Sequence, residues 1–199
     1  MKGTSRRWII FAVTIAPVTI TCGLAFFVSI HAIPSSTLAG LMGYLAIGLG
    51  LGYISYFPGT AGALLGIIIA LALDRLRPWM QLLTTVVLVA LAVPICEYGA
   101  REYQGSDKAR IVADEALTFP VATVALPVRY HPALLAGVFI ISRVLDSLKP
   151  PPARAVEKLP GGIGIVYDDV VVNAWTLLFG LIGWEWYHRR WRNMRYRNR

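Results

Sequence analysis

Long apolar segments dominate this chain and decide what it can fold into. The segment Trp8–Ile30 holds no charged side chain, and Val170–Trp186 is almost as apolar. A bilayer crossing needs about 20 apolar residues, so we expect both segments to cross a membrane. Of the 199 residues, 56% are hydrophobic and only 15% are charged, which is more apolar surface than a soluble domain of this length buries. The sequence therefore predicts an all-α integral membrane protein.

Between these two segments the chain carries further apolar stretches: Leu38–Tyr53, Ala61–Leu73, Met80–Ile95, Ala116–Val128 and Pro132–Leu145. Most are short for a full crossing, and Pro120 and Pro127 interrupt one of them, so we expect short, re-entrant helices among them. The fold class expected is a polytopic helical bundle. Its expected parts are an N-terminal membrane helix at 1–34, a main domain at 35–187 and an arginine-rich tail at 188–199.

Polar residues gather in three stretches, namely Tyr53–Thr60, Glu97–Glu115 and Arg143–Asp169. Two helical hairpins would return the chain to one face and bring these stretches together. The hairpins would pair Ala61–Leu73 with Met80–Ile95, and Ala116–Val128 with Pro132–Leu145. Basic residues before the first apolar segment favour a cytoplasmic location for this face. The same count places the arginine-rich tail outside, against the positive-inside tendency, so the number of crossings stays open.

The net charge of +8 is concentrated at the C-terminal end, because six of the 19 basic residues lie in Arg189–Arg199. Such a tail either contacts anionic lipid headgroups or is a solvated anchor after the last helix. It lacks the pattern of a nucleic-acid-binding domain, so we expect a membrane partner and no nucleic acid. Cys22 and Cys96 lie in or at the end of apolar segments without metal-ligand spacing, which is typical of small core residues.

The first block with chemical content is GLGLGYISYFPGTAGALLG, residues 48–66. Irregular backbone at membrane depth is tolerated where it lines a cavity or is buried in protein. Gly59 and Thr60 precede an apolar segment, and free amide groups at a helix N-terminus are suited to holding a phosphate. The alternative is close helix packing through glycine, which is common in membrane helices.

The second block is DKARIVADEALTF, residues 107–119. On a helix, Arg110 and Asp114 are four residues apart and Asp107 is seven residues before Asp114, so these three side chains would share a face. The neighbouring acids Asp114 and Glu115 suit a hard cation, which is held by carboxylate oxygens. The alternative is a solvated helix with an ion pair.

The third block is SRVLDSLKPPPARAVEKLPGGIGIVYDD, residues 142–169. Arg143 and Asp146 are one helical turn apart, and Lys149 precedes a run of prolines. Arginine and lysine here suit a phosphate site, although they could also extend to lipid headgroups. The glycines at 161–164 predict a tight turn that directs Asp168 and Asp169 into the same place. Two adjacent carboxylates repel each other, and a divalent cation between them and the Asp114-Glu115 pair would offset this repulsion.

Acid clusters without His or Cys favour magnesium-like ions. The blocks therefore predict a divalent cation held by carboxylates from two parts of the chain. The proposed metal ligands are Asp114, Glu115, Asp168 and Asp169.

In this order, the four blocks resemble the phosphatidylglycerophosphatase A family, and the resemblance covers roughly residues 45–175. That family consists of small bacterial inner-membrane enzymes that remove the phosphate monoester of phosphatidylglycerophosphate and need magnesium. The resemblance thus implies a multi-pass lipid phosphatase, with its active site on the cytoplasmic side and 35–187 as the catalytic domain. The family's charged positions are matched here by Asp107, Asp114, Glu115, Asp146, Asp168 and Asp169 and by the basic residues Arg143 and Lys149.

The mechanism we expect is metal-assisted hydrolysis of a phospholipid substrate. Arg143 and Lys149, with Gly59 and Thr60, would hold the phosphate. One acid outside the metal site, Asp107 or Asp146, would relay a proton. The sequence leaves open whether water or an aspartate attacks the phosphorus, and also the oligomeric state. The competing function is a small ion-coupled transporter or channel, which would place its acids near the membrane midplane.

The chain departs from the family pattern at a few positions, namely Ile54, Ser55, Ala113, Pro151 and Asn173. None of these departures removes a charged group. They leave the headgroup and acyl-chain preference open.

Overall fold

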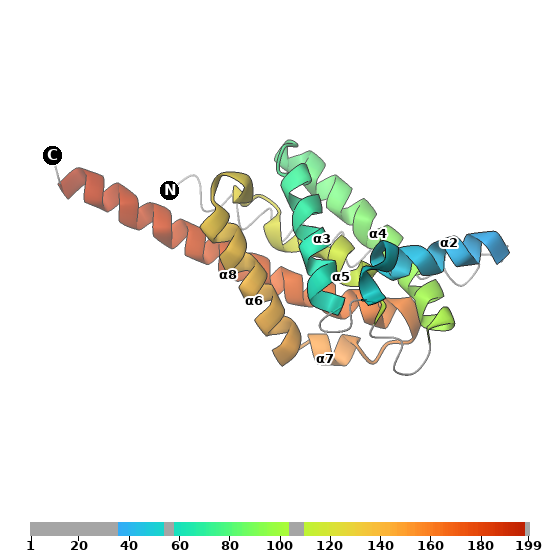
Figure 1. Cartoon of the computed structure of the whole chain (residues 1–199). Helices are drawn as coiled ribbons and strands as arrows, with labels where there is room; N and C mark the ends of the chain where they lie inside the picture. Colours follow the sequence, from blue (N-terminus) through green and yellow to red (C-terminus); the bar gives the residue numbers. More distant parts are fainter. Residues whose placement is uncertain (1–35, 54–57, 104–109, 198–199) are drawn as a thin grey trace.

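The computed structural model describes residues 36–53, 58–103 and 110–197, and these ranges contain helices and no strand. The helices are α2 (Ser36–Ala46), η1 (Gly48–Tyr53), α3 (Pro58–Leu73), α4 (Pro78–Glu102), α5 (Ala113–Thr118), η3 (Phe119–Thr123), η4 (Val128–Tyr130), α6 (Pro132–Leu148), α7 (Ala153–Val156) and α8 (Gly161–Arg197). Here α denotes α-helices and η denotes 3₁₀-helices. The expected all-α class is confirmed (Figure 1).

Two of the described helices are long and apolar enough to cross a membrane, α4 and the part of α8 up to Arg190. Helix α4 has 25 residues and extends beyond the expected segment Met80–Ile95 at both ends. Helix α8 has 37 residues, or roughly 55 Å at 1.5 Å per residue, so its C-terminal part projects beyond the other helices (Figure 1). The expected first crossing, Trp8–Ile30, lies outside the described residues. The architecture is that of a helical membrane protein with short helices packed among long ones.

The short helix α5 lies at the centre of the bundle and packs against α3, α4 and α8 (Figure 1). Our expectation of a helical hairpin between Ala116–Val128 and Pro132–Leu145 is wrong, because α5 ends at Thr118 and continues as the buried 3₁₀-helix η3. Pro120 lacks a backbone N–H, and this favours the end of the α-helix there. The expected helix face shared by Arg110 and Asp114 is also absent, since Arg110 lies before α5. The Arg110 guanidinium lies instead over the Tyr53 ring, with its Cζ 5.2 Å from the ring centroid.

Small residues let α3 approach the central segment closely. A Cβ atom added at Gly62 would lie 2.6 Å from the carbonyl oxygen of Val112, and one added at Gly66 would lie 2.6 Å from Cβ of Phe119. These distances are too short for any larger residue without a backbone shift. The packing interpretation of the glycine-rich block therefore holds for these two positions.

Gly161 has a φ of 68° and turns the chain into α8, as expected of a glycine-rich turn. Gly162 and Gly164 already lie in the first turn of α8, so the turn does not form a loop before the aspartate pair. Gly162 packs on the backbone of α4, and its N–H donates a 2.6 Å hydrogen bond to Oε2 of Glu97. Glu97 thus satisfies one of the free amide groups at the start of α8. Asp168 and Asp169 consequently lie inside α8, about 100° apart around its axis.

A chain of buried hydrogen bonds joins three helices next to this region. The Ser142 hydroxyl on α6 donates to Oδ1 of Asn173 on α8 at 2.9 Å, and Nδ2 of Asn173 donates to the Thr118 hydroxyl of α5 at 3.0 Å. All three side chains are at most 1% exposed. In an apolar interior such a chain fixes the relative position of the helices, because each unpaired member would cost free energy.

We predict that Asn173→Leu lowers the free energy of unfolding by about 1–3 kcal/mol, because it leaves two buried hydroxyls without their partner. The change is measured by thermal unfolding of the purified protein in detergent. The variant Asn173→Leu combined with Ser142→Ala and Thr118→Val removes all three polar groups and should recover part of the loss. Equal stability of Asn173→Leu and the unmodified protein would show that the chain of hydrogen bonds contributes nothing.

Candidate active site

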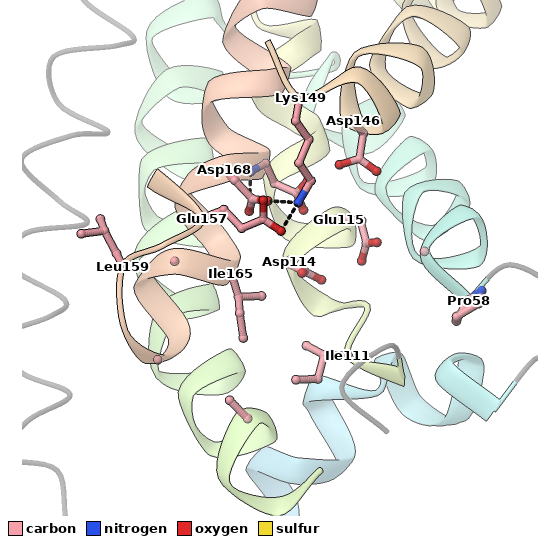
Figure 2. Close-up of a pocket in the computed structure, with 15 residues that line it drawn as sticks. Pro58, Ile111, Asp114, Glu115, Asp146, Lys149, Glu157, Leu159, Ile165 and Asp168 are labelled. Atoms are coloured by element: carbon pink, nitrogen blue, oxygen red, sulfur yellow. Dashed lines mark hydrogen bonds and ion pairs between the residues drawn. The ribbon is translucent and has the colours of Figure 1, made fainter. Parts of the chain in front are cut away.

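A cavity of about 670 Å³ opens among α3, α4, α5, α6 and α8, and the segments on either side of α7 complete its wall (Figure 2). Most of the site residues named from the sequence line it: Gly59, Asp114, Glu115, Asp146, Lys149, Asp168 and Asp169. Its remaining wall is largely apolar, with Pro58, Ala100, Ile111, Leu159 and Ile165. The cavity therefore combines a charged wall with an apolar one.

Three carboxylates meet at the inner wall of this cavity. One oxygen each from Asp114 and Glu115 of α5 and from Asp169 of α8 lie within 4.8 Å of one another. Asp114 is 9% exposed and Asp169 is 4% exposed. Oδ1 of Asp114, Oε2 of Glu115 and Oδ2 of Asp169 are buried and have no hydrogen-bond partner within the described part of the chain. Buried acceptors normally have a partner, so these oxygens point to a bound group that supplies one.

The electrostatics of this cluster oppose three simultaneous negative charges. Burial raises the pKa of Asp114 well above its usual value, and the neighbouring Glu115 charge raises it further. Burial also raises the pKa of Glu115, against a smaller opposing effect of Asp114 and the Arg143 guanidinium. Without a cation these acids retain protons that a solvated carboxyl group would lose.

A divalent cation fits this donor set. Magnesium and manganese are bound through oxygen, and the three oxygens without partners are all carboxylate oxygens. Cys96 is buried, but its thiol is a soft ligand and is not one of the three groups of the cluster. The structure thus supports a metal site formed by Asp114, Glu115 and Asp169.

Asp168 does not belong to this cluster, although the sequence grouped it with the metal ligands. Its Oδ2 accepts a 2.9 Å hydrogen bond from Nζ of Lys149, and its Oδ1 accepts one from the backbone N–H of Asp169 at 3.0 Å. Lys149 also forms a 2.6 Å ion pair with Glu157 (Figure 2). Burial alone would lower the pKa of Lys149, but these two carboxylates outweigh it and raise the pKa above its usual value.

Arg143 lies beside the acid cluster on α6. Its Nη1 is 3.5 Å from Oδ2 of Asp146, one helical turn later, as the spacing predicted. Its Nε is buried and has no hydrogen-bond partner within the described ranges. A buried guanidinium nitrogen without a partner next to a cavity is suited to a phosphate oxygen.

The structure places the other predicted site residues less directly. Gly59 lines the cavity in the first turn of α3, and a side chain added there would collide with the Glu115 carboxylate. Thr60 is partly buried in the same turn, but it does not line the cavity in the described structure. Asp107 lies outside the described residues.

Two residues that contact parts of the candidate site escaped the sequence reasoning, Glu157 and Glu97. Glu157 is the single acid between Asp146 and Asp168, within a stretch rich in proline and basic residues, and this isolation was the available signal. Glu97 caps α8 from α4, and no local pattern announces a contact across 65 residues.

The comparison with protein families decides what this site belongs to. The model of the family described as phosphatidylglycerophosphatase A matches residues 44–183, which is most of the chain and contains every described residue of the site. The chain belongs to the phosphatidylglycerophosphatase A family. The resemblance drawn from the four sequence blocks is confirmed, and with it the expectation of an enzyme.

Individual relatives agree with this membership. The chain is 36% identical over 148 residues to phosphatidylglycerophosphatase A of Escherichia coli (strain K12), covering 71% of this chain and 83% of the relative. It is 33% identical over 136 residues to phosphatidylglycerophosphatase A of Haemophilus influenzae, and the match covers 67% of this chain and 83% of the relative. The chain is also 34% identical over 140 residues to a Bacteroides thetaiotaomicron protein that is provisionally named a phosphatidylinositol-3-phosphatase. This match covers 67% of this chain and 87% of the relative. No solved structure matches the chain.

We predict that magnesium or manganese raises the melting temperature of the purified protein by roughly 5–10 °C at a hundredfold excess over its Kd, measured by a thermal scan. The Asp169→Asn variant should lose this increase. Its melting temperature in chelator should not fall, because one of three repelling carboxylates is gone.

The matched control is Asp74→Asn, because Asp74 lies at the turn between α3 and α4, where it accepts from Gln81 and Arg129. This control should keep the metal-dependent increase. An Asp169→Asn variant that is destabilised in chelator yet still responds fully to magnesium would contradict the metal site.

Proposed function

We propose that this protein hydrolyses the phosphate monoester of phosphatidylglycerophosphate in a magnesium-dependent reaction, giving phosphatidylglycerol and inorganic phosphate. The observation that carries the proposal is the set of three carboxylate oxygens without partners at a cavity that Lys149 lines, with Arg143 next to Asp146 in its wall. Acceptors for a cation and donors for a phosphate thus occur together, as hydrolysis of a phosphate ester requires. The activity named for the relatives from E. coli and H. influenzae supports the same reaction.

The cavity also suits the amphiphilic character of a lipid. Asp114, Glu115 and Lys149 form part of its charged wall, whereas Ile111 and Ile165 form part of its apolar wall. A lipid headgroup would place its phosphate against the charged wall and its less polar part along the apolar wall. Burial of apolar surface there would contribute to binding without taking part in the chemistry.

Asp114, Glu115 and Asp169 would hold the magnesium ion, and Asp168 is assigned to Lys149 in place of the metal. When bound, magnesium supplies polarisation of a phosphoryl oxygen and a lower pKa for a coordinated water. The remaining steps depend on side chains of the chain itself. All of these assignments, including the catalytic set Asp107, Asp114, Glu115, Asp146, Asp168 and Asp169, are our proposals.

Arg143 and Lys149 would bind the phosphate from two sides. The Arg143 guanidinium offers a buried Nε without a partner, and its planar fork suits two phosphate oxygens. The Lys149 ammonium has three N–H donors and is directed into the cavity by Asp168. Both charges offset the negative charge that develops on the phosphoryl group in the transition state. Gly59 keeps the start of α3 open to the phosphate, and Thr60 is assigned a supporting role in the same turn.

Asp146 is the acid best placed to move a proton. It lines the cavity, is not part of the carboxylate cluster, and contacts Arg143 at 3.5 Å. A carboxylate in this position could accept a proton from an attacking water or return one to the leaving glycerol oxygen. Asp107 stays a second candidate for this role.

We further propose that the protein is a multi-pass protein of a bacterial inner membrane with its site on the cytoplasmic side. The N-terminal helix at 1–34 and α4 and α8 would provide crossings, and the tail at 188–199 would contact anionic lipid headgroups. The transporter alternative is disfavoured, because family membership indicates an enzyme. In addition, Asp168 and Asp169 lie within the first three turns of α8 and not at its middle.

We predict that purified protein releases phosphate from phosphatidylglycerophosphate with magnesium and stops in excess chelator. Asp169→Asn should lose roughly 100-fold or more in kcat/KM, since even residues that only support metal ligands contribute 10–100-fold. It should also need more magnesium. Asp168→Asn should instead raise KM at an unchanged magnesium requirement, because it releases Lys149.

Phosphatidylinositol 3-phosphate serves as the comparison substrate in the same assay, because one relative carries that name. We expect slower hydrolysis of this lipid. Full activity in chelator would contradict the magnesium proposal, and faster hydrolysis of the inositol lipid would reassign the substrate.

We predict that cysteines at Lys158 and Arg77, in a chain whose Cys22 and Cys96 are alanine, are labelled from opposite sides of the membrane. Lys158 precedes α8 near the C-terminal end of α4, and Arg77 precedes α4 at its other end. Lys158→Cys should react from the cytoplasmic side. Labelling of both positions from one side would mean that α4 does not cross.

A further inference from the structure

The backbone around Lys149 directs this side chain into the cavity. Helix α6 ends at Leu148, and Lys149 follows with φ 44° and ψ 69°, in the left-handed region. Three prolines, 150–152, come next and restrict the chain on the other side. The stem of Lys149 is thereby fixed at a junction between α6 and α7, and its ammonium group reaches across to α8.

The ammonium group lies between two carboxylates that differ in their surroundings (Figure 2). Asp168 is only 11% exposed, and its second oxygen is already bonded to the backbone N–H of Asp169. Glu157 follows the four-residue helix α7 and is 51% exposed. Asp168 is therefore the fixed, inner partner of Lys149, and Glu157 is the outer partner on the solvent side.

A phosphate entering the cavity brings a third anion to this single ammonium group. A phosphate and two carboxylates around one cation repel one another, so one of the acids has to leave. Releasing Asp168 would leave a carboxylate buried without its cation, which is costly. Releasing Glu157 returns an exposed carboxylate to water, and exposed ion pairs contribute little.

We propose that Glu157 is the exchangeable partner of Lys149. In the free enzyme Glu157 forms an ion pair with the Lys149 ammonium group, and the incoming phosphate displaces Glu157 from it. Glu157 thus lowers the affinity of the site for phosphate, and it pairs with Lys149 again when inorganic phosphate leaves. The proposal rests on the proposed function, because it concerns the same cavity and the same phosphate. It adds a residue that acts on binding rather than on the bond that breaks.

The consequence is a specific pattern of binding constants. Competition for Lys149 weakens the substrate and the phosphate product by the same interaction, which is uniform binding and does not accelerate the chemical step. A residue that merely held Lys149 in place would have the opposite effect, because its removal would weaken phosphate binding. The sign of the change separates the two roles.

The experiment compares Glu157→Gln with the unmodified protein, using inorganic phosphate as the probe. Phosphate binding is measured directly by calorimetry in magnesium, and its inhibition constant is measured in the hydrolysis assay. We expect Glu157→Gln to bind phosphate about two- to fivefold more tightly, as the strength of an exposed ion pair implies. KM for phosphatidylglycerophosphate should fall by a similar factor, and by more than any change in kcat. Unchanged or weaker phosphate binding by Glu157→Gln overturns the proposal.

Two controls isolate the Lys149 contact. Glu185→Gln removes an exposed glutamate that pairs with Arg189 at 3.2 Å, away from the cavity, and should not change phosphate binding. In a Lys149→Gln background, Glu157→Gln should have no further effect. A gain in phosphate affinity that persists in that background would show that only the general negative charge of Glu157 matters, and would overturn the exchange.

The outcomes also separate this proposal from the proposed function. Hydrolysis that is normal in its substrate and magnesium requirement, with no change on Glu157→Gln, rejects the exchange alone. Absence of hydrolysis together with tighter phosphate binding by Glu157→Gln rejects the substrate assignment and supports the exchange. Absence of both hydrolysis and phosphate binding rejects both.

Discussion

Mutual repulsion among clustered acids, three of them largely buried, is the constraint on which this structure depends. Six acids line the cavity, Asp114, Glu115, Asp146, Glu157, Asp168 and Asp169, and the basic groups facing them are Lys149 and Arg143. A low-dielectric interior strengthens repulsion between like charges as well as attraction between opposite ones. The helices therefore have to hold the acids together against their charge, through close glycine packing, the buried hydrogen-bond chain at Asn173 and the cap from Glu97. A bound cation would offset this repulsion, and the same cluster of carboxylates would then be its binding site.

The two adjacent aspartates point in different directions because of helix geometry. Asp168 and Asp169 differ by about 100° around α8, so neighbours in sequence face different partners. Asp168 faces Lys149, whereas Asp169 faces Asp114 and Glu115 across the bundle. In the proposed function, one helix thus contributes to both the phosphate site and the metal site.

The sequence predicted the blocks, their convergence and most of the charged residues, because charged groups in an apolar chain need a shared polar place. It missed the orientation of Asp168, since a glycine pair permits a loop and a helix start equally well. It overestimated Ala116–Val128, because apolar composition does not tell a crossing helix from a short buried one. Glu157 and Glu97 escaped because their partners lie on other helices, and such contacts depend on packing that no local pattern encodes.

The central position of α5 has a consequence for the biogenesis of the protein. The segment from Ala113 to Thr123 is too short to cross a bilayer and carries two acids, so the translocon cannot insert it as an independent helix. Its neighbours α3 and α4 are synthesised before it, whereas α8 is synthesised last. The contacts of this segment with α8 can therefore form only after α8 has been synthesised. The carboxylate cluster of Asp114, Glu115 and Asp169 is then complete only once α8 packs against α5.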